Sequence, residues 1–253
     1  MVTRPHLKRI LLVQCAMVEL EAGRQAFATP AGLPVLIGPI KLFPANHDIQ
    51  RLGCSVLLSI SAEQEARALI CEHGALGVLM DTLKHHTETA VLLPAMNTLL
   101  VLSEEDAVKK KLSEDGAVRD LLQARQNAPV EESDLRRSLA ATLANLACLQ
   151  DLDQHKADFL ECGGVDCLMD VLLLHAADVD MQIRVTSALW ELLLLEAGRI
   201  QLLEMQSAVE SIIASMTQRP TVMKLQLACC GILNQLSKVL RPLVSALLTH
   251  VYA

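Results

Sequence analysis

A segment of thirteen residues recurs five times along this chain of 253 residues. The copies read IQRLGCSVLLSIS (49–61), VLLPAMNTLLVLS (91–103), LRRSLAATLANLA (135–147), MQIRVTSALWELL (181–193) and LQLACCGILNQLS (225–237). The ninth position is always leucine: Leu57, Leu99, Leu143, Leu189 and Leu233. A weaker copy, CAMVEL (15–20), ends on Leu20, and the steps from Leu20 through Ile60, Leu102, Leu146 and Leu192 to Leu236 are 40, 42, 44, 46 and 44 residues. Such a period is typical of stacked helical repeats.

The stretches between the copies also recur. Four of them carry a glycine where one helix should end and a sharp turn begin, because glycine accepts the positive φ of a helix C-terminus. These glycines are Gly32, Gly74, Gly116 and Gly163. SAEQ from Ser61 and SEED from Ser103 resemble capping boxes, and the expected N-caps of the longer helices are Asp48, Ser133, Asp180 and Thr221. Each unit is therefore predicted to be a short helix, a second helix and a longer helix.

Composition explains why such units should stack. Hydrophobic residues make up 52% of the chain and aromatic residues only 2%, so the core must be aliphatic, which favours helices. Small residues on one flank of the long helix let a neighbouring helix approach closely; they include Gly53, Cys54, Ala140, Cys229 and Cys230. One unit cannot cover its own apolar face, whereas several in a row share a continuous core. We predict a single all-α domain over 1–253, with approximate units 1–31 (partial), 32–73, 74–115, 116–162, 163–205 and 206–253.

The repeat resembles the armadillo family. The resemblance rests on the period, on three helices per unit, on segments such as ECGGVDCLMDVLL and LRRSLAATLANLA, and on AGLPVL (31–36), where Pro34 stands at the start of a second helix. It covers roughly residues 10 to 240. It implies a right-handed α-α superhelix of about five three-helix repeats with partial end units. Two-helix HEAT-type repeats are the alternative.

Nuclear-transport members of this family carry a tryptophan four residues before an asparagine on the third helix, and the asparagines hold an extended peptide. Here the asparagine column reads Ser59, Val101, Asn145, Glu191 and Gln235. The tryptophan column reads Ser55, Asn97, Ala141, Ser187 and Gly231. One asparagine is present and Trp190 stands one position off the column, so a nuclear-transport adaptor is disfavoured. Asn145 either faces the groove or is an ordinary solvated helix residue.

Small side chains in these columns favour a partner helix over an extended strand. We expect Arg51, Arg137 and Arg184 to give the groove a basic edge for acidic groups of the partner; solvated surface arginines are the alternative. The predicted partner-binding groove consists of Arg51, Ser55, Ser59, Asn97, Arg137, Asn145, Arg184, Ser187, Glu191 and Gln235.

Other classes of function are disfavoured. A net charge of −7 argues against nucleic-acid binding, and charged residues interrupt every apolar run before the length of a membrane span. The eight cysteines form no CxxC pair, which excludes a zinc ribbon. The KHH sequence at 84–86 with Glu88 is a weak metal candidate, because adjacent helical residues diverge. Without a nucleophile elbow or a phosphate-binding loop, we expect a non-enzyme with no catalytic residue, bound metal or cofactor.

These observations favour a protein-interaction scaffold that is a subunit of a larger cytoplasmic or cytoskeletal assembly. A regulatory module for a small GTPase or an enzyme is the alternative. The high mean hydropathy of +0.35 favours apolar surface that is buried against a partner. The first unit has no polar cap helix and the segment RPLVSALLTHVYA is apolar, so we expect another protein or a second copy of the chain to cover at least one end of the solenoid. The segment 123–134 is the candidate for a contact outside the groove. The expected location is the cytoplasm, with the nucleus, a cilium or other cytoskeletal structure, and, because of the basic opening MVTRPHLKRILLVQ, the mitochondrion as alternatives.

Overall fold

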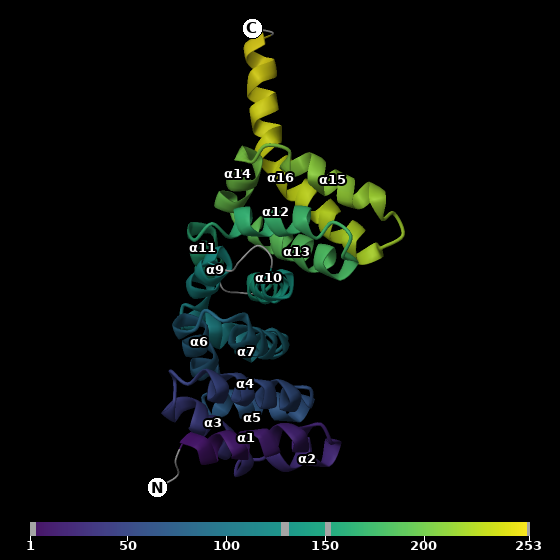
Figure 1. Cartoon of the computed structure of the whole chain (residues 1–253). Helices are drawn as coiled ribbons and strands as arrows, with labels where there is room; N and C mark the ends of the chain where they lie inside the picture. Colours follow the sequence, from purple (N-terminus) through teal and green to yellow (C-terminus); the bar gives the residue numbers. More distant parts are fainter. Residues whose placement is uncertain (1–3, 128–131, 150–152, 252–253) are drawn as a thin grey trace. The chain divides into compact units, whose positions relative to one another are not determined.

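A computed structural model describes residues 4–127, 132–149 and 153–251 of the chain. Within these ranges sixteen α-helices follow one another and no strand forms, which confirms the all-α prediction (Figure 1). None of the described helices combines the length and the apolar character needed to cross a membrane. Part of the candidate contact segment 123–134 lies outside the described residues.

The helices come in triples, as the sequence predicts. The short helices are α2 (Glu21–Phe27), α5 (Gln64–Glu72), α8 (Asp106–Glu114), α11 (Asp153–Glu161) and α14 (Glu196–Glu204). The middle helices each have 11 residues and are α3 (Gly32–Leu42), α6 (Ala75–His85), α9 (Ala117–Asn127), α12 (Gly164–Leu174) and α15 (Ala208–Gln218). The long helices are α1 (Arg4–Val18), α4 (His47–Ser61), α7 (Thr89–Leu102), α10 (Ser133–Ala147), α13 (Val179–Leu192) and α16 (Met223–Val251).

Three of the four predicted glycine turns are confirmed. Gly74, Gly116 and Gly163 precede α6, α9 and α12 with φ of 77°, 74° and 78°, a conformation that costs a residue with a side chain about 1–2 kcal/mol. The prediction for Gly32 was wrong, because this residue is the first of α3 and a Cβ there would lie 2.7 Å from the Phe27 carbonyl oxygen. At the turn before α15, Ser207 adopts a φ of 63° without being glycine.

The helix N-caps lie elsewhere than the sequence suggests. Asn46 and Asp178 cap α4 and α13, and each side chain accepts a bond from the backbone N–H three residues later, at 3.1 Å. The predicted caps Asp48 and Asp180 lie inside the first turn instead, and Ser133 is the first residue of α10.

The capping boxes are also wrong. Ser61 and Ser103 turn back, and their hydroxyls donate to the carbonyls of Leu58 and Leu100. Ser61 is the last residue of α4 and Ser103 is the C-cap of α7, so neither stands at the N-cap position of the next short helix. The N-cap residues of α5 and α8 are Glu63 and Glu105, and neither side chain makes a capping bond.

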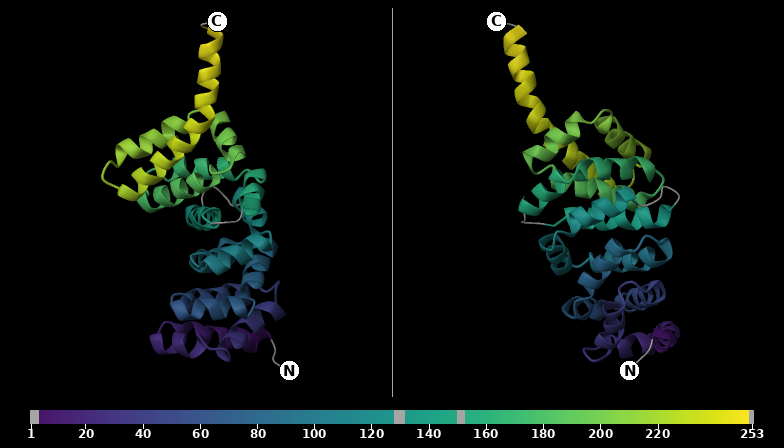
Figure 2. Two further views of the ribbon diagram at one scale, coloured as in Figure 1. Left: turned by 180° about the vertical axis from the view of Figure 1, so that it is seen from behind. Right: turned by 60° about the vertical axis from the view of Figure 1, so that its left-hand side comes forward.

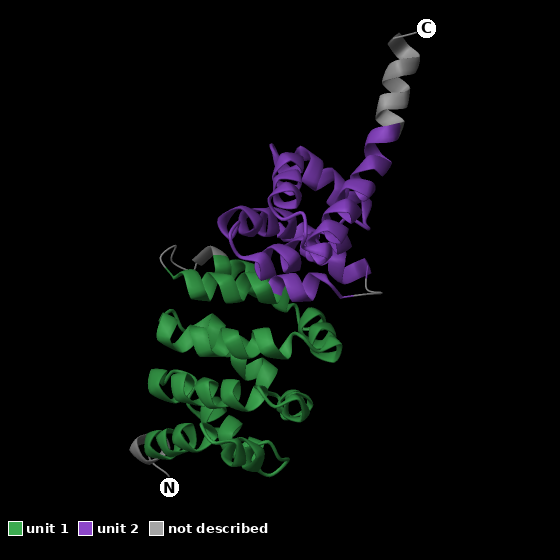
Figure 3. Ribbon diagram, turned by 90° about the vertical axis from the view of Figure 1, so that its right-hand side faces the viewer, with its two compact units in different colours: residues 1–142 green, residues 143–253 purple. Residues whose placement is uncertain are grey.

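The chain divides into two compact units, residues 1–142 and 143–253, and the boundary falls within α10 (Figure 3). The expectation of a single domain and the exact repeat boundaries stay predictions.

In the first unit the long helices α1, α4 and α7 lie side by side, with α3 and α6 packed against α4 and α7 (Figures 1 and 2). Leu57, Leu99 and Ile60 are completely buried in this stack. Leu20 departs from the expected pattern, since it follows α1 and is 67% exposed. The alignment of Leu20 with Ile60 was therefore wrong.

In the second unit α12 and α13 pack together, and α13 packs against α16. Leu143, Leu189 and Leu192 are buried, whereas Leu233 is only half-buried. Trp190, off the expected column, packs against α16, where a Cβ added to Gly231 would lie 2.3 Å from the indole. Close packing of an aromatic ring thus explains the glycine at this position.

Candidate protein-binding face

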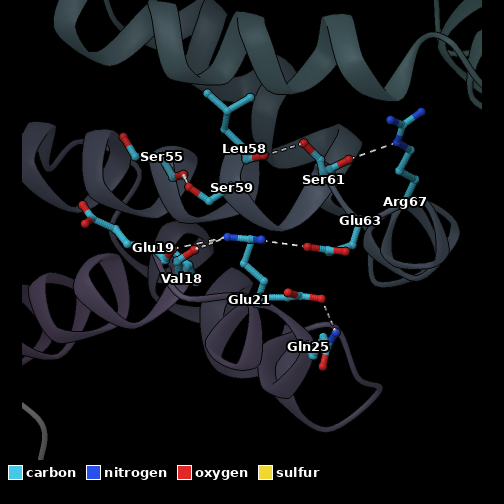
Figure 4. A network of polar contacts seen from close by, with 11 residues as sticks. Val18, Glu19, Glu21, Gln25, Ser55, Leu58, Ser59, Ser61, Glu63 and Arg67 are labelled. Atoms are coloured by element: carbon cyan, nitrogen blue, oxygen red, sulfur yellow. Dashed lines mark hydrogen bonds and ion pairs between the residues drawn. The ribbon is translucent and has the colours of Figure 1, made fainter.

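The predicted groove residues lie on the long helices, and all of them except Gln235 are at least partly exposed. The surface that they form in each unit is here called the long-helix face. In the first unit, Arg51, Ser55 and Ser59 follow one another at successive turns of α4, each partly exposed. The Ser55 hydroxyl donates to the Arg51 carbonyl at 2.9 Å, and the Ser59 hydroxyl donates to the Ser55 carbonyl at 3.1 Å (Figure 4). Because both hydroxyl groups donate to carbonyls of α4 itself, the two serines do not offer a row of free hydrogen-bond donors to a ligand.

Asn97 is the only member of its column with an amide, and it joins two long helices. Its Oδ1 accepts a hydrogen bond of 2.6 Å from the hydroxyl of Ser138 on α10. Asn97 on α7 is half-buried, and Arg137, next to Ser138, is exposed. The asparagine thus links the long helices of neighbouring repeats.

The positive charge of Arg51 on this face has a carboxylate, Asp48, beside it. Arg51 lies 4.0 Å from Asp48, which also forms an ion pair with Lys8 of α1. The hydrogen bond from Lys8 lowers the pKa of Asp48, with the nearby charges of Lys8 and Arg51 acting in the same direction. Asp48 is therefore ionised at neutral pH and offsets part of the positive charge expected for the basic edge.

In the second unit, Asn145 accepts a hydrogen bond of 3.0 Å from Nη1 of Arg184. Arg184 of α13 therefore already donates one hydrogen bond within the protein, to a residue of α10. Glu191 accepts a bond of 2.9 Å from the largely buried Lys156 of α11. Ser187 is half-buried and Gln235 is buried, so Gln235 adds little to the surface.

The second position of the repeated segment has a role that sequence reasoning missed. Nε2 of Gln50 donates to the carbonyls of Ile40 and Phe43, at the C-terminus of α3, at 2.8 and 3.0 Å. Its Oε1 accepts from the hydroxyl of Thr82 on α6 at 2.7 Å. The glutamine thus caps its own middle helix and binds the middle helix of the next repeat.

The same glutamine clamp recurs in the second unit. Gln182 donates to the Leu172 and His175 carbonyls at 2.6 and 3.2 Å and accepts from Ser215 at 2.8 Å. Gln226 donates to the Met216 and Arg219 carbonyls at 2.8 and 3.1 Å. The separations in sequence, ten and seven residues, are those of Gln50, so the column Gln50, Gln182 and Gln226 was the available signal.

A basic residue near the start of each short helix was also missed. Arg24, Arg67 and Arg199 each donate to a carbonyl six residues earlier, at the end of the preceding long helix: Val18, Ser61 and Leu193. Figure 4 shows the bond from Arg67 to Ser61. Arg24 also pairs with Glu63 of the next repeat at 2.7 Å, and Arg67 with Glu105 at 3.2 Å. The sequence signal is the column Arg24, Arg67, Lys109, Lys156 and Arg199, at steps of 43, 42, 47 and 43 residues.

The weak metal candidate at 84–86 has a structural explanation. His86 is buried, and its Nε2 lies 2.7 Å from the Pro44 carbonyl oxygen, so this nitrogen carries the proton. Its ring meets that of His47 edge to face at 4.9 Å. Among the described residues, no three His, Cys, Asp or Glu side chains gather where they could hold a metal ion.

No family model matches the chain, and no curated protein matches its sequence. Solved structures match its fold. A designed armadillo repeat protein is 17% identical, with a TM-score of 0.72 over 92% of this chain and 94% of that one. A second designed armadillo repeat protein, in complex with the peptide (KR)4, is 17% identical with a TM-score of 0.68 over 92% and 94%.

An armadillo-repeats-only protein from Plasmodium falciparum is 21% identical, with a TM-score of 0.57 over 74% of this chain and 80% of that one. The helix triples of this chain agree with these structures and not with a two-helix repeat. The chain therefore has the all-α armadillo-repeat fold.

Proposed function

We propose that this protein is a non-catalytic scaffold that binds an acidic partner helix on the long-helix face of its first unit. The observation that carries the proposal is the surface of α4 and α7. Ser55, Ser59 and Asn97 present small, partly exposed side chains whose strongest bonds are already made within the protein. A helix can pack closely on such a surface, because few polar groups lose hydration without gaining a partner.

Charge determines which helix we expect. Arg51 in α4 and Arg137 in α10 stand at the third position of their copies of the repeated segment, and both are at least partly exposed. One of the structurally similar designed proteins was solved with the basic peptide (KR)4, so a basic ligand is the natural competitor. We favour an acidic amphipathic helix, whose carboxylates would meet the two guanidinium groups.

The test measures binding of two fluorescein-labelled peptides by anisotropy: an amphipathic helical peptide with glutamates on its polar face, and (KR)4. We expect the acidic peptide to bind and (KR)4 not to. The double variant Arg51→Glu with Arg137→Glu should weaken the acidic peptide at least tenfold. Arg119→Glu, an exposed position on the middle helix α9, is the control for the charge change and should leave the affinity unchanged. Equal binding to the double variant would refute the proposal.

Membership of a larger assembly is the second part of the proposal. Ile10, Val13 and Met17 form a stripe on α1 and are 43%, 59% and 43% exposed. If Val18 is matched to Ser61, as the bonds from Arg24 and Arg67 indicate, these residues correspond to Gly53, Val56 and Ile60, which are all buried in α4. The same face that α4 buries is open in α1, and apolar faces of this kind mark protein contacts.

A second copy or another subunit would remove this surface from water. Size-exclusion chromatography with light scattering of the purified chain, alone and after Val13→Glu, tests whether it associates through α1. We expect a mass above that of the monomer that falls to the monomer in the variant; a monomer in both cases would count against self-association. The cytoplasm stays our expectation for the location, and regulation of a small GTPase or an enzyme stays the alternative role.

A further inference from the structure

The short-helix side of the first unit contains a cavity that the long-helix face does not use. It has a volume of 480 Å³, and α5, α6 and α8 line it. Apolar atoms come from Ala68, Cys71, Leu76 and Val108, while Glu72 and Glu105 lie at its rim. A volume of this size is within the range of sites that bind ligands.

The cavity is elongated. Its lining runs along α5 from the first residue, Gln64, to the last, Glu72, and along α8 from the N-cap Glu105 to the C-cap Asp115. Nine helical residues extend over about 13 Å at 1.5 Å per residue. An elongated apolar channel between two helices suits the side chains of a peptide better than a compact metabolite.

The rim carries an excess of negative charge. The lining includes three carboxylates, those of Glu72, Glu105 and Asp115, and one cation, that of Lys111. Arg67 lies 3.2 Å from Glu105. Lys111 pairs with Asp115 at 2.9 Å. In the described part of the chain no ion pair involves Glu72, and as the last residue of α5 it stands at the negative end of the helix dipole.

The pKa of Cys71, in the cavity wall, responds to the negative charges at the rim. Burial, with smaller contributions from the charges of Glu105 and Glu72, raises the pKa of the Cys71 thiol to about 11. Cys71 therefore stays protonated at neutral pH and behaves as an apolar wall residue, while the negative potential that raises its pKa would attract a cation.

From this shape and charge we propose that the cavity is a second protein-binding site, which takes a peptide segment with a large apolar side chain next to a lysine or arginine. The apolar side chain packs on Ala68, Cys71 and Leu76, and the cation pairs with Glu72 at the rim. This site is separate from the long-helix face and selects the opposite charge, so one unit can hold two chemically different partners.

A displayed library of random peptides, with the full chain as bait, tests the proposal. We expect enriched peptides that place a large apolar residue beside Lys or Arg. Ala107→Trp fills the cavity from an exposed position of α8 and should weaken these peptides at least tenfold, as should Glu72→Lys. Circular dichroism confirms that both variants fold.

The chain supplies a matched control. Glu161 is the exposed last residue of α11, as Glu72 is of α5, so Glu161→Lys changes the charge equally at the same place in another repeat and should leave binding unchanged. Bound peptide should also slow alkylation of Cys71 by iodoacetamide, but not that of the exposed Cys230. The proposal is overturned if no enriched peptide loses affinity in Ala107→Trp, or if the peptides lost in that variant are acidic.

Discussion

The layers formed by α3 with α4 and by α12 with α13 have a glutamine at the second position of the repeated segment, whereas the layer formed by α6 with α7 has a leucine there. Gln50 binds the carbonyls at the C-terminus of α3, and Gln182 binds those at the C-terminus of α12. Leu92 stands at the same place in α7 and can make no such bonds. All three middle helices nevertheless have 11 residues, although α6 ends one residue nearer to Leu92 than α3 and α12 end to their glutamines. The comparison indicates that the apolar columns build the stack and that the glutamine stabilises one helix end within it.

The largest effects are expected where the layers are alike. Leu57→Ala and Leu99→Ala each remove a side chain with no exposed surface, and each should lower the free energy of unfolding by about 2–5 kcal/mol. Urea denaturation followed by circular dichroism measures both. Similar losses in the two variants would support a common apolar column; a loss in Leu99→Ala of less than half that in Leu57→Ala would show that the clamped layer carries more of the stability.

Gln182→Leu converts a clamped layer into one like that of α7. The change leaves the Leu172 and His175 carbonyls and the Ser215 hydroxyl without their side-chain partner, and we expect a loss of about 1–3 kcal/mol. Fluorescence of Trp190, the one tryptophan of the chain, follows unfolding of this unit directly. No loss in this variant would mean that water replaces the clamp without cost, and the distinction between the layers would have no energetic meaning.

The reverse change, Leu92→Gln, tests whether the clamp can be built where the chain lacks it. The carbonyls that match those of Ile40 and Phe43 belong to Leu83 and His86, nine and six residues before Leu92 at the end of α6. Two new hydrogen bonds to their carbonyls should raise the free energy of unfolding by about 0.5–1 kcal/mol, less than Gln182→Leu removes, because Leu92 also contributes apolar contacts. A destabilised variant would show that α6 and α7 lie at a distance that the glutamine cannot span.

The smallest expected effect concerns the turns before the middle helices. Gly74, Gly116 and Gly163 adopt a positive φ without strain, whereas Ser207 does so with a side chain. Ser207→Gly should therefore stabilise the second unit by about 0.5–1 kcal/mol, the strain relief being partly offset by the greater freedom of glycine in the unfolded chain. Thermal denaturation monitored by Trp190 would show a higher midpoint. The matched change Gly163→Ser should lower it.

Sequence reasoning predicted the helix triples and the buried leucine columns because periodicity is recorded directly in the order of residues. It failed where two residues compete for one role. Asn46 and Asp48, or Asp178 and Asp180, are equally good caps in isolation, and only the backbone decides between them. The weak first copy was aligned on Leu20 because leucine is common in the column, although the exposed Leu20 lies outside the stack.

The candidate face stays a prediction, and the hydrogen bonds of its residues could not be foreseen from the sequence. The sequence placed Asn97, Asn145 and Arg184 on long helices, but their hydrogen bonds join residues 41 and 39 positions apart. Such bonds depend on the distance between neighbouring helices and on side-chain rotamers, neither of which a periodic pattern specifies. The cavity beside Cys71 was missed for the same reason, because its walls come from three helices.

The arginines that follow α1, α4 and α13 bear on how a chain of this kind can change length in evolution. Each reaches back over the same six residues to the last carbonyls of a long helix. An inserted or deleted residue inside those intervals would move the guanidinium away from its acceptor. We therefore expect the connections between long and short helices to keep their length during evolution. The chain can then become longer by insertions in the connections between middle and long helices, or by duplication of an entire repeat with its own arginine.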